Sequence, residues 1–204
     1  MGKVTISFVW AFIQKFGNTF LSFISNIILA RLLLPEDYGA IGMIMIFIVI
    51  SNTFIDGGFG SALIQKTNPT TKDYSTIFYW NIFFSIGLYI VLYFCAPFIA
   101  SFYKLPLLNN LLKVLGVVLI INSLSVVQST QLRKKLKFKE CAYATVISSL
   151  LAVCVTVFLA YNGMGVWSLV IQQILVSVFS FLLYLYFNKW IPCLLYTSDA
   201  ADER

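Results

Sequence analysis

Two ionisable side chains lie inside apolar stretches of the sequence, where charges are rare and usually functional. Asp56 ends an apolar run that begins after Gly39, and Lys15 lies within a first apolar run near the N-terminus. A charge in hydrocarbon is costly unless it faces a partner or a water-filled cavity. Asp56 is therefore either an ion-coupling residue or an interfacial residue at a helix end. Lys15 either faces a cavity or extends to the membrane surface.

Polar side chains recur along one face of several apolar segments. In the first segment, Lys15, Asn18 and Asn26 follow a 3.6-residue period. Such amides either hold membrane helices together or line a cavity with hydrogen-bonding groups. We take these polar residues, with two basic residues near the ends of the apolar runs, as candidates for binding a substrate. The set is Lys15, Asn18, Asn26, Arg31, Lys66, Gln128, Gln172 and Gln173.

A basic run occupies residues 133–139. A run of this kind either sets the orientation in the membrane and touches anionic lipid, or captures a diphosphate headgroup. Arg133, Lys134 and Lys135 are the candidates for this headgroup or lipid contact. Because the run is a short loop between two apolar segments, we do not expect nucleic-acid binding.

The composition excludes an ordinary soluble domain. Hydrophobic residues make up 60% of the chain and charged residues 11%, whereas a soluble domain has about 25% charged residues. The chain has no histidine, and its four cysteines show no CxxC spacing. No nucleophile with a base, paired carboxylates or phosphate-binding glycine loop is recognisable. We therefore predict a membrane protein that is not an enzyme and has no metal site or cofactor.

Six segments are apolar enough over about 20 residues to cross a bilayer as helices. They are residues 8–30, 38–64, 76–102, 107–130, 142–161 and 166–187. The N-terminus, the C-terminal end and the loops on the same side of the membrane as the N-terminus carry nine basic residues. The loops on the other side carry only Arg31 and Lys104. The positive-inside rule then predicts a multi-pass protein with a cytoplasmic N-terminus.

The last residues do not fit this pattern. Residues 193–204 resemble the in-frame translation of a sequencing adapter, so we predict a non-native tail there. Residues 1–192 would then form one six-helix lobe of a truncated protein.

Several short sequence words resemble bacterial polysaccharide exporters of the colanic-acid and teichuronic-acid type, within the multidrug/oligosaccharidyl-lipid/polysaccharide flippase superfamily. The words, in chain order, are Ala30-Arg31-Leu32-Leu33, Pro35-Glu36-Asp37-Tyr38-Gly39, the run from Asp56 to Lys66, Asp73-Tyr74-Ser75-Thr76, the basic loop at Arg133, and Gly165-Val166-Trp167-Ser168-Leu169-Val170.

This resemblance implies an all-α fold in which six transmembrane helices form one lobe of a two-lobe flippase. It implies a bacterial inner-membrane location, alternating access and a missing C-terminal lobe as partner. The implied cargo is an undecaprenyl-diphosphate-linked oligosaccharide for O-antigen, capsule or exopolysaccharide assembly. Two alternatives stay open: a drug or organic-cation antiporter of the same superfamily, and a membrane scaffold without transport activity.

Overall fold

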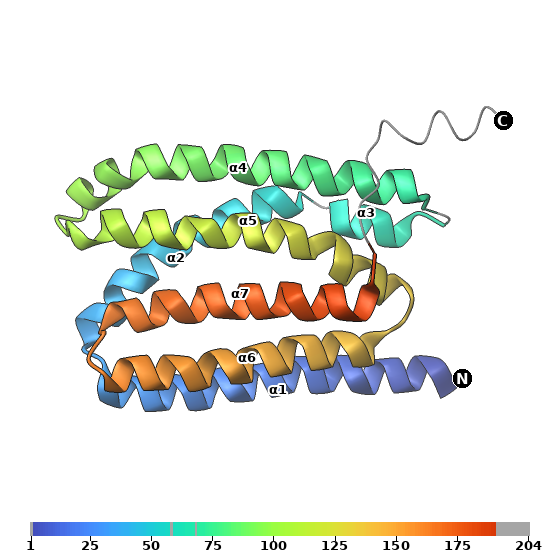
Figure 1. Ribbon diagram of the computed structural model, residues 1–204, viewed down its shortest axis with the longest axis horizontal. Helices are drawn as coiled ribbons and strands as arrows, with labels where there is room; N and C mark the ends of the chain where they lie inside the picture. The colour runs from blue at the N-terminus through green and yellow to red at the C-terminus, as the bar shows by residue number, and fades with distance from the viewer. Residues whose placement is uncertain (1, 58, 68, 191–204) are drawn as a thin grey trace.

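The computed structural model describes residues 2–57, 59–67 and 69–190 of the chain, and these residues are almost entirely helical. The proposed tail at 193–204 lies outside the described residues. The predicted all-α fold is confirmed (Figure 1). The helices are α1 (Gly2–Leu32), α2 (Pro35–Asp56), α3 (Phe59–Gln65), α4 (Thr71–Phe102), α5 (Leu107–Lys134), α6 (Phe138–Tyr161) and α7 (Val166–Asn188).

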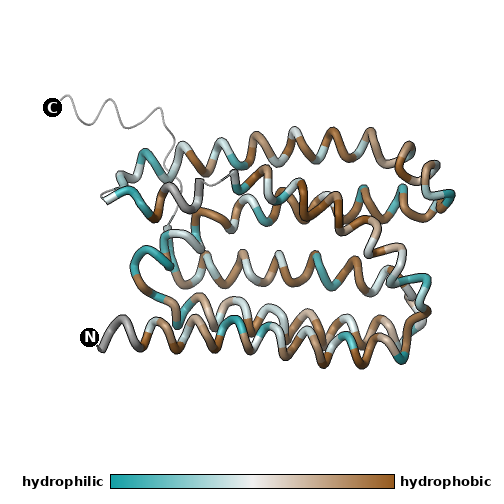
Figure 2. The backbone as a smooth tube through the Cα atoms, turned by 180° about the vertical axis from the view of Figure 1, so that it is seen from behind, coloured by the Kyte–Doolittle hydropathy of each residue, from teal (hydrophilic) through white to brown (hydrophobic). Residues whose placement is uncertain are grey.

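Five of the described helices are long and apolar enough to cross a membrane: α2, α4, α5, α6 and α7. Helix α1 is not among them, although its 31 residues would span about 46 Å at 1.5 Å per residue. Its polar stripe, which includes Lys15 and Asn18, lowers its mean hydropathy. Figure 2 shows hydrophobic residues along most of each helix, with hydrophilic ones at the connections and at intervals inside several helices.

The predicted helix over residues 38–64 is wrong in one respect, because the structure divides it in two. Helix α2 ends at Asp56, and Gly57 follows in the left-handed region with φ 41°, its N–H donating to the Thr53 carbonyl. A glycine in this conformation is a common helix terminator. The short helix α3 then continues the chain in a new direction as far as Gln65.

The long helices pack side by side as a bundle (Figure 1). Helix α1 lies against α6, α6 against α7, α7 against α5, and α5 against α4, while α2 packs mainly on α5. The main apolar core joins α2, α4, α5 and α7 and includes the fully buried side chains of Ile44, Leu111 and Leu119. A smaller core around Leu29 and Leu169 joins α1 to α7. Tyr38 and Ile41 of α2 also pack against this smaller core, so it joins the start of α2 to α1.

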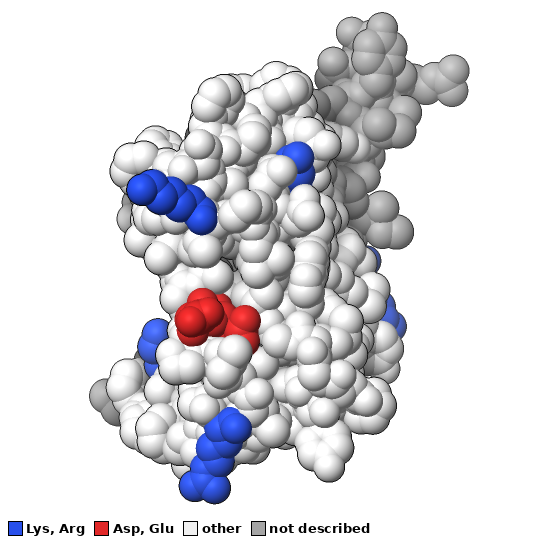
Figure 3. Space-filling view, turned by 90° about the vertical axis from the view of Figure 1, so that its left-hand side faces the viewer, with Lys and Arg blue, Asp and Glu red and all other residues white. Residues whose placement is uncertain are grey.

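The connections lie at two opposite ends of the bundle. The N-terminus, α3 and the α5–α6 connection are at one end, which we call the basic end because the 133–139 run lies there (Figure 1). The α1–α2, α4–α5 and α6–α7 connections are at the other end, which carries separate basic groups and one acidic patch (Figure 3). Two acidic residues, Glu36 and Asp37, lie there in the first turn of α2.

Asp37 links two of the sequence words in space. Its carboxylate accepts a hydrogen bond from the Leu34 N–H at 3.2 Å and so helps to begin α2. The same carboxylate oxygens lie 3.8 Å from the position that a Cβ on Gly165 would take, just before α7 begins. A negative charge near the N-termini of two helices is favoured by both helix dipoles.

Candidate functional site

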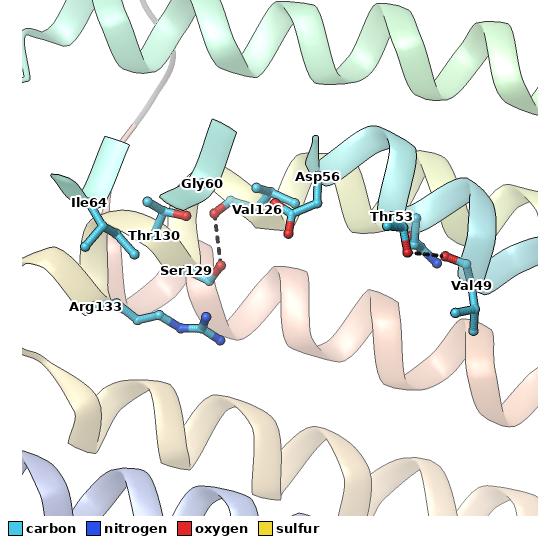
Figure 4. A pocket seen from close by; sticks show the side chains of 10 residues that line it. Val49, Thr53, Asp56, Gly60, Ile64, Val126, Ser129, Thr130 and Arg133 are labelled. Carbon is cyan, nitrogen blue, oxygen red and sulfur yellow. Dashed lines mark hydrogen bonds between the residues drawn. The ribbon is translucent and has the colours of Figure 1, made fainter. Parts of the chain in front are cut away.

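A cavity of about 580 Å³ opens at the junction of α2, α3 and α5; we call it the Asp56 cavity (Figure 4). Its lining combines one carboxylate and one guanidinium with amide, hydroxyl and apolar side chains. The lining residues are Val49, Asn52, Thr53, Asp56, Gly60, Ile64, Val126, Ser129, Thr130 and Arg133.

The position of Asp56 follows from the way in which α2 ends. Since Asp56 is the last residue of α2 and Gly57 turns the chain away, the carboxylate is exposed at the cavity instead of being packed inside a continuous helix. Helix α3 then passes close to it. A Cβ on Gly60 would lie 3.3 Å from Asp56 Oδ1 and 3.4 Å from Thr130 Oγ1. The glycine therefore leaves space beside the carboxylate.

A second cavity of about 320 Å³ lies between α1 and α6; we call it the Lys15 cavity. It is lined by Ala11, Gln14, Lys15, Asn18, Arg133 and Thr145. Arg133, near the end of α5, thus contributes to the walls of both cavities. Figure 4 shows its side chain extending away from the α5 ribbon.

The two cavities together hold charges of both signs. Lys15 and Arg133 are exposed cations and Asp56 is an exposed carboxylate. Within the described residues, no ion pair joins Asp56 to either cation. The cations are therefore available to an anionic ligand, and the carboxylate is available to a proton or a cation.

Several polar residues of the predicted stripes join helices to one another. Ser149 Oγ donates to Asn18 Oδ1 at 2.6 Å, which links α6 to α1. Gln172 Nε2 donates to Ser25 Oγ at 3.1 Å, which links α7 to α1. Asn26 takes part through its backbone carbonyl, which accepts a 3.4 Å hydrogen bond from the Tyr38 hydroxyl. Of these three candidates, Asn18 also lines a cavity.

Gln128 belongs to a buried amide cluster at the end of α7. Its Nε2 donates to the Trp190 carbonyl at 3.0 Å, and its Oε1 accepts from Asn188 Nδ2 at 2.6 Å. Asn188 Nδ2 also donates to Gln131 Oε1 at 2.8 Å. The Trp190 ring packs edge-on against Phe78 of α4. Gln128 therefore holds the chain that leaves α7, and it lines neither cavity.

The structure places the other predicted site residues away from the two cavities. Arg31 is in the last turn of α1, sixteen residues after Lys15, and lines neither cavity. Lys66 pairs with Asp73 at 2.7 Å near the start of α4. Gln173 is half-buried on α7 and lines neither cavity.

The three basic candidates at the end of α5 have different surroundings. Arg133 faces both cavities, and Lys135 is exposed just after α5 ends. Lys134 Nζ donates to the carbonyls of Leu63 at 2.7 Å and of Lys66, so its ammonium group binds the C-terminal end of α3. Only Arg133 of the three lines a cavity.

Sequence reasoning missed Asn52 and Thr53. Both lie on α2 and line the Asp56 cavity, and Asn52 Oδ1 accepts a 3.3 Å hydrogen bond from Asn122 Nδ2 of α5. A signal was present, because Asn52, Thr53 and Asp56 are polar residues within one turn of an apolar segment. Among the described residues, no group of three or more His, Cys, Asp or Glu side chains is placed to hold a metal ion.

Comparison with known proteins identifies relatives whose names refer to polysaccharide biosynthesis or transport, together with one uncharacterized membrane protein. Teichuronic acid biosynthesis protein TuaB of Bacillus subtilis is 28% identical over 150 residues, which cover 72% of this chain and 31% of TuaB. Succinoglycan biosynthesis transport protein ExoT of Rhizobium meliloti is 27% identical over 169 residues, covering 83% of this chain and 34% of ExoT. An uncharacterized membrane protein in the cps region of Klebsiella pneumoniae is 26% identical over 157 residues, covering 77% of this chain and 32% of that protein. No solved structure matches the chain.

The matched stretch spans about a third of the length of each of these relatives. The sequence model of one family, described as polysaccharide biosynthesis protein, matches residues 28–203. That range includes most of the segment 193–204, whose origin as a non-native tail stays a prediction. Since the match covers most of the sequence, the chain belongs to the polysaccharide biosynthesis protein family.

Proposed function

We propose that this chain is the N-terminal lobe of a transporter that flips lipid-linked oligosaccharides across the bacterial inner membrane for surface polysaccharide assembly. The observation that carries the proposal is the pair of adjoining cavities that share Arg133. The names of two relatives, which refer to teichuronic acid biosynthesis and succinoglycan transport, support a polysaccharide as the end product.

The chemistry of a lipid-linked sugar matches this arrangement. Its apolar tail can stay in the bilayer, whereas its diphosphate and sugar need cations, amides and hydroxyls to replace water. Lys15 and Arg133 supply the cations, and Asn18, Asn52 and Thr145 are among the cavity-lining groups that can hydrogen-bond sugar hydroxyls. Arg133 is suited to the diphosphate because a guanidinium binds phosphate oxygens in a bidentate manner.

Asp56 has a separate role in the proposal. A carboxylate in the larger cavity repels a diphosphate but can bind a proton or a metal cation. Its presence in the same cavity as Arg133 supports coupling, in which Asp56 loads a cation in one state of the cycle and releases it in another. This coupling requires two states with different affinities for the cation.

The proposal includes a second lobe and a defined orientation. Alternating access needs a surface opposite the two cavities, and the matched third of each relative leaves room for it. The basic end, with the 133–139 run, faces the cytoplasm under the positive-inside rule. The cavities near Arg133 then open on the side where lipid-linked sugars are made.

The test uses the complete gene that encodes this chain, expressed in cells deleted for their own flippase. Surface polysaccharide and inner-leaflet lipid-linked sugar are measured together. We expect the wild type to restore the polymer and clear the intermediate. A Lys15→Gln/Arg133→Gln double variant should lose both effects, whereas a matched Lys135→Gln/Lys189→Gln variant at the same end keeps them.

Other outcomes contradict the proposal in distinct ways. If the intermediate still accumulates while resistance to cationic drugs rises and depends on Asp56, the antiporter alternative replaces it. If neither assay changes although the protein is abundant in the membrane, even with the lipid-linked sugar of its own host supplied, the scaffold alternative is favoured. If both double variants transport equally well, Arg133 and Lys15 have no role in binding.

A further inference from the structure

A third cavity lies at the end of the bundle opposite the basic end, where α4 turns into α5. Its volume is about 430 Å³. It shares no lining residue with the Asp56 or Lys15 cavity, and the proposed transport function does not use it. The lining residues are Pro97, Ala100, Ser101, Lys104, Pro106 and Asn109.

Asn109 gives the first indication of what this cavity binds. Its Oδ1 atom is buried and has no hydrogen-bond partner among the described residues. Leaving a buried acceptor unpaired costs free energy, so such atoms in native proteins usually have a donor. A ligand hydroxyl would satisfy this acceptor once the Asn109 amide, which lines the cavity, turns toward it.

Two cations accompany this acceptor. Lys104 is exposed and lines the cavity, and Ser101 also lines it. Lys113 is four residues further along α5 than Asn109, so it is about one helical turn deeper. Its Nζ lies 4.6 Å from the centre of the Tyr93 ring, which holds the ammonium group on the α4–α5 surface.

The surface around the cavity is strongly apolar. Ile90 and Phe94 of α4 are 48% and 68% exposed, and they lie one to two turns before Pro97 on the cavity side of α4. These side chains lie within a span that the sequence makes suitable for a bilayer. A cavity suited to an anionic group that carries a hydroxyl therefore adjoins a surface suited to hydrocarbon chains. A free phosphate ion would not need such a surface.

We propose that this cavity binds the headgroup of an anionic phospholipid that carries a free hydroxyl, as in phosphatidylglycerol. The lipid phosphate accepts hydrogen bonds from Lys104 and Ser101, and a headgroup hydroxyl donates to Asn109 Oδ1. The acyl chains run along Ile90 and Phe94, away from this end of the bundle. Lys113 adds positive charge one turn deeper, beside the glycerol backbone of the lipid.

Native mass spectrometry of the purified 204-residue chain tests the site. Binding is titrated with phosphatidylglycerol, zwitterionic phosphatidylcholine, and phosphatidylethanol, which has the same charge as phosphatidylglycerol but no headgroup hydroxyl. We expect phosphatidylglycerol to bind best. Lys104→Gln should weaken it about fivefold, as for one basic residue at a membrane surface, whereas Lys189→Gln, at the basic end but outside the 133–139 run, leaves it unchanged.

A second variant tests the hydroxyl contact separately. Asn109→Leu should remove the preference for phosphatidylglycerol over phosphatidylethanol, while both lipids keep their advantage over phosphatidylcholine. Equal binding of all three lipids to the wild type would overturn the proposal, and so would equal losses in Lys104→Gln and Lys189→Gln. Displacement of phosphatidylglycerol by millimolar inorganic phosphate would identify a free-anion site instead. Since no transport is measured, these outcomes are independent of the proposed function.

Discussion

Replacing Lys134 with methionine tests how the end of α5 fixes one wall of the Asp56 cavity. Lys134 Nζ donates to the carbonyls of Leu63, Ile64 and Lys66, at the C-terminal end of α3. Helix α3 has only seven residues and carries Gly60, which lines the cavity. A helix this short is unstable by itself. We therefore expect Lys134 to be a main anchor of α3, although the sequence alone suggested a lipid headgroup as its partner.

The size of the effect follows from the geometry of these bonds. The bond to the Leu63 carbonyl is partly buried at 2.7 Å, whereas the other two are exposed and compete with water. One hydrogen bond to a charged group contributes about 1.5–3 kcal/mol. Since each 1.4 kcal/mol is a factor of ten, Lys134→Met should speed amide exchange in α3 about 10- to 150-fold. Methionine keeps the apolar length of the side chain and removes only the ammonium group.

Hydrogen–deuterium exchange with peptide-level mass spectrometry measures this change. Lys135→Met is the matched control, since Lys135 is the exposed neighbour at the end of α5. Exchange in α6 and α7 should stay the same in both variants, which shows that the bundle remains folded. If exchange in α3 is equally slow in Lys134→Met and in the wild type, the carbonyl contacts do not hold α3 and the reasoning is wrong.

Three further predictions concern packing and stability, measured as thermal unfolding midpoints in detergent. Gly116→Ala should destabilise the chain by about 1–2 kcal/mol, because the new methyl group would lie 2.7 Å from the Tyr89 ring. Gly87→Ala is the control for this variant: its methyl group meets nothing within 4 Å, so it should stabilise the chain by up to about 1 kcal/mol. Gly165→Ala should cost about 1–2 kcal/mol, since φ is 55° there. Asn188→Ala should cost about 1–3 kcal/mol, because it leaves the side-chain oxygens of two buried glutamines without a donor. An unchanged unfolding midpoint in any of the destabilising variants would contradict the contact or backbone conformation given as its reason.

The helical fold was predictable because membrane helices are encoded locally. A run of about 20 apolar residues must satisfy its own backbone in lipid, so its length and composition suffice. The predicted segment 166–187 matches α7 to within one residue. The break at Gly57 was harder to predict, because a glycine inside an apolar run either continues a helix or ends it. Contacts between α3 and α5 decide between the two, and they depend on residues about 70 positions apart.

The partners of the basic residues could not be read from the sequence for the same reason. Arg133, Lys134 and Lys135 are adjacent and chemically similar, yet successive residues on a helix point about 100° apart. That rotation directs Arg133 toward the two cavities and Lys134 toward the α3 carbonyls. The sequence alone made Lys66 a candidate for substrate binding, whereas in the structure it pairs with Asp73 after the turn that follows α3. Composition indicates that cations gather at this end, but only the packing indicates which of them faces a cavity.

The sharing of Arg133 has a mechanical consequence for the proposed transport cycle. Asp56 is carried by α2, which packs on α5, whereas Lys15 is carried by α1, which packs on α6. Arg133 is near the last residue of α5, just before the chain passes to α6. A change in the separation of these two helix pairs must therefore move Arg133 relative to Lys15, Asp56 or both. Binding of a diphosphate between Arg133 and Lys15 would draw the pairs together, and a cation on Asp56 would weaken any attraction of Arg133 toward α2. The two ligands would then favour the same arrangement of the lobe, which is the linkage that coupled transport requires.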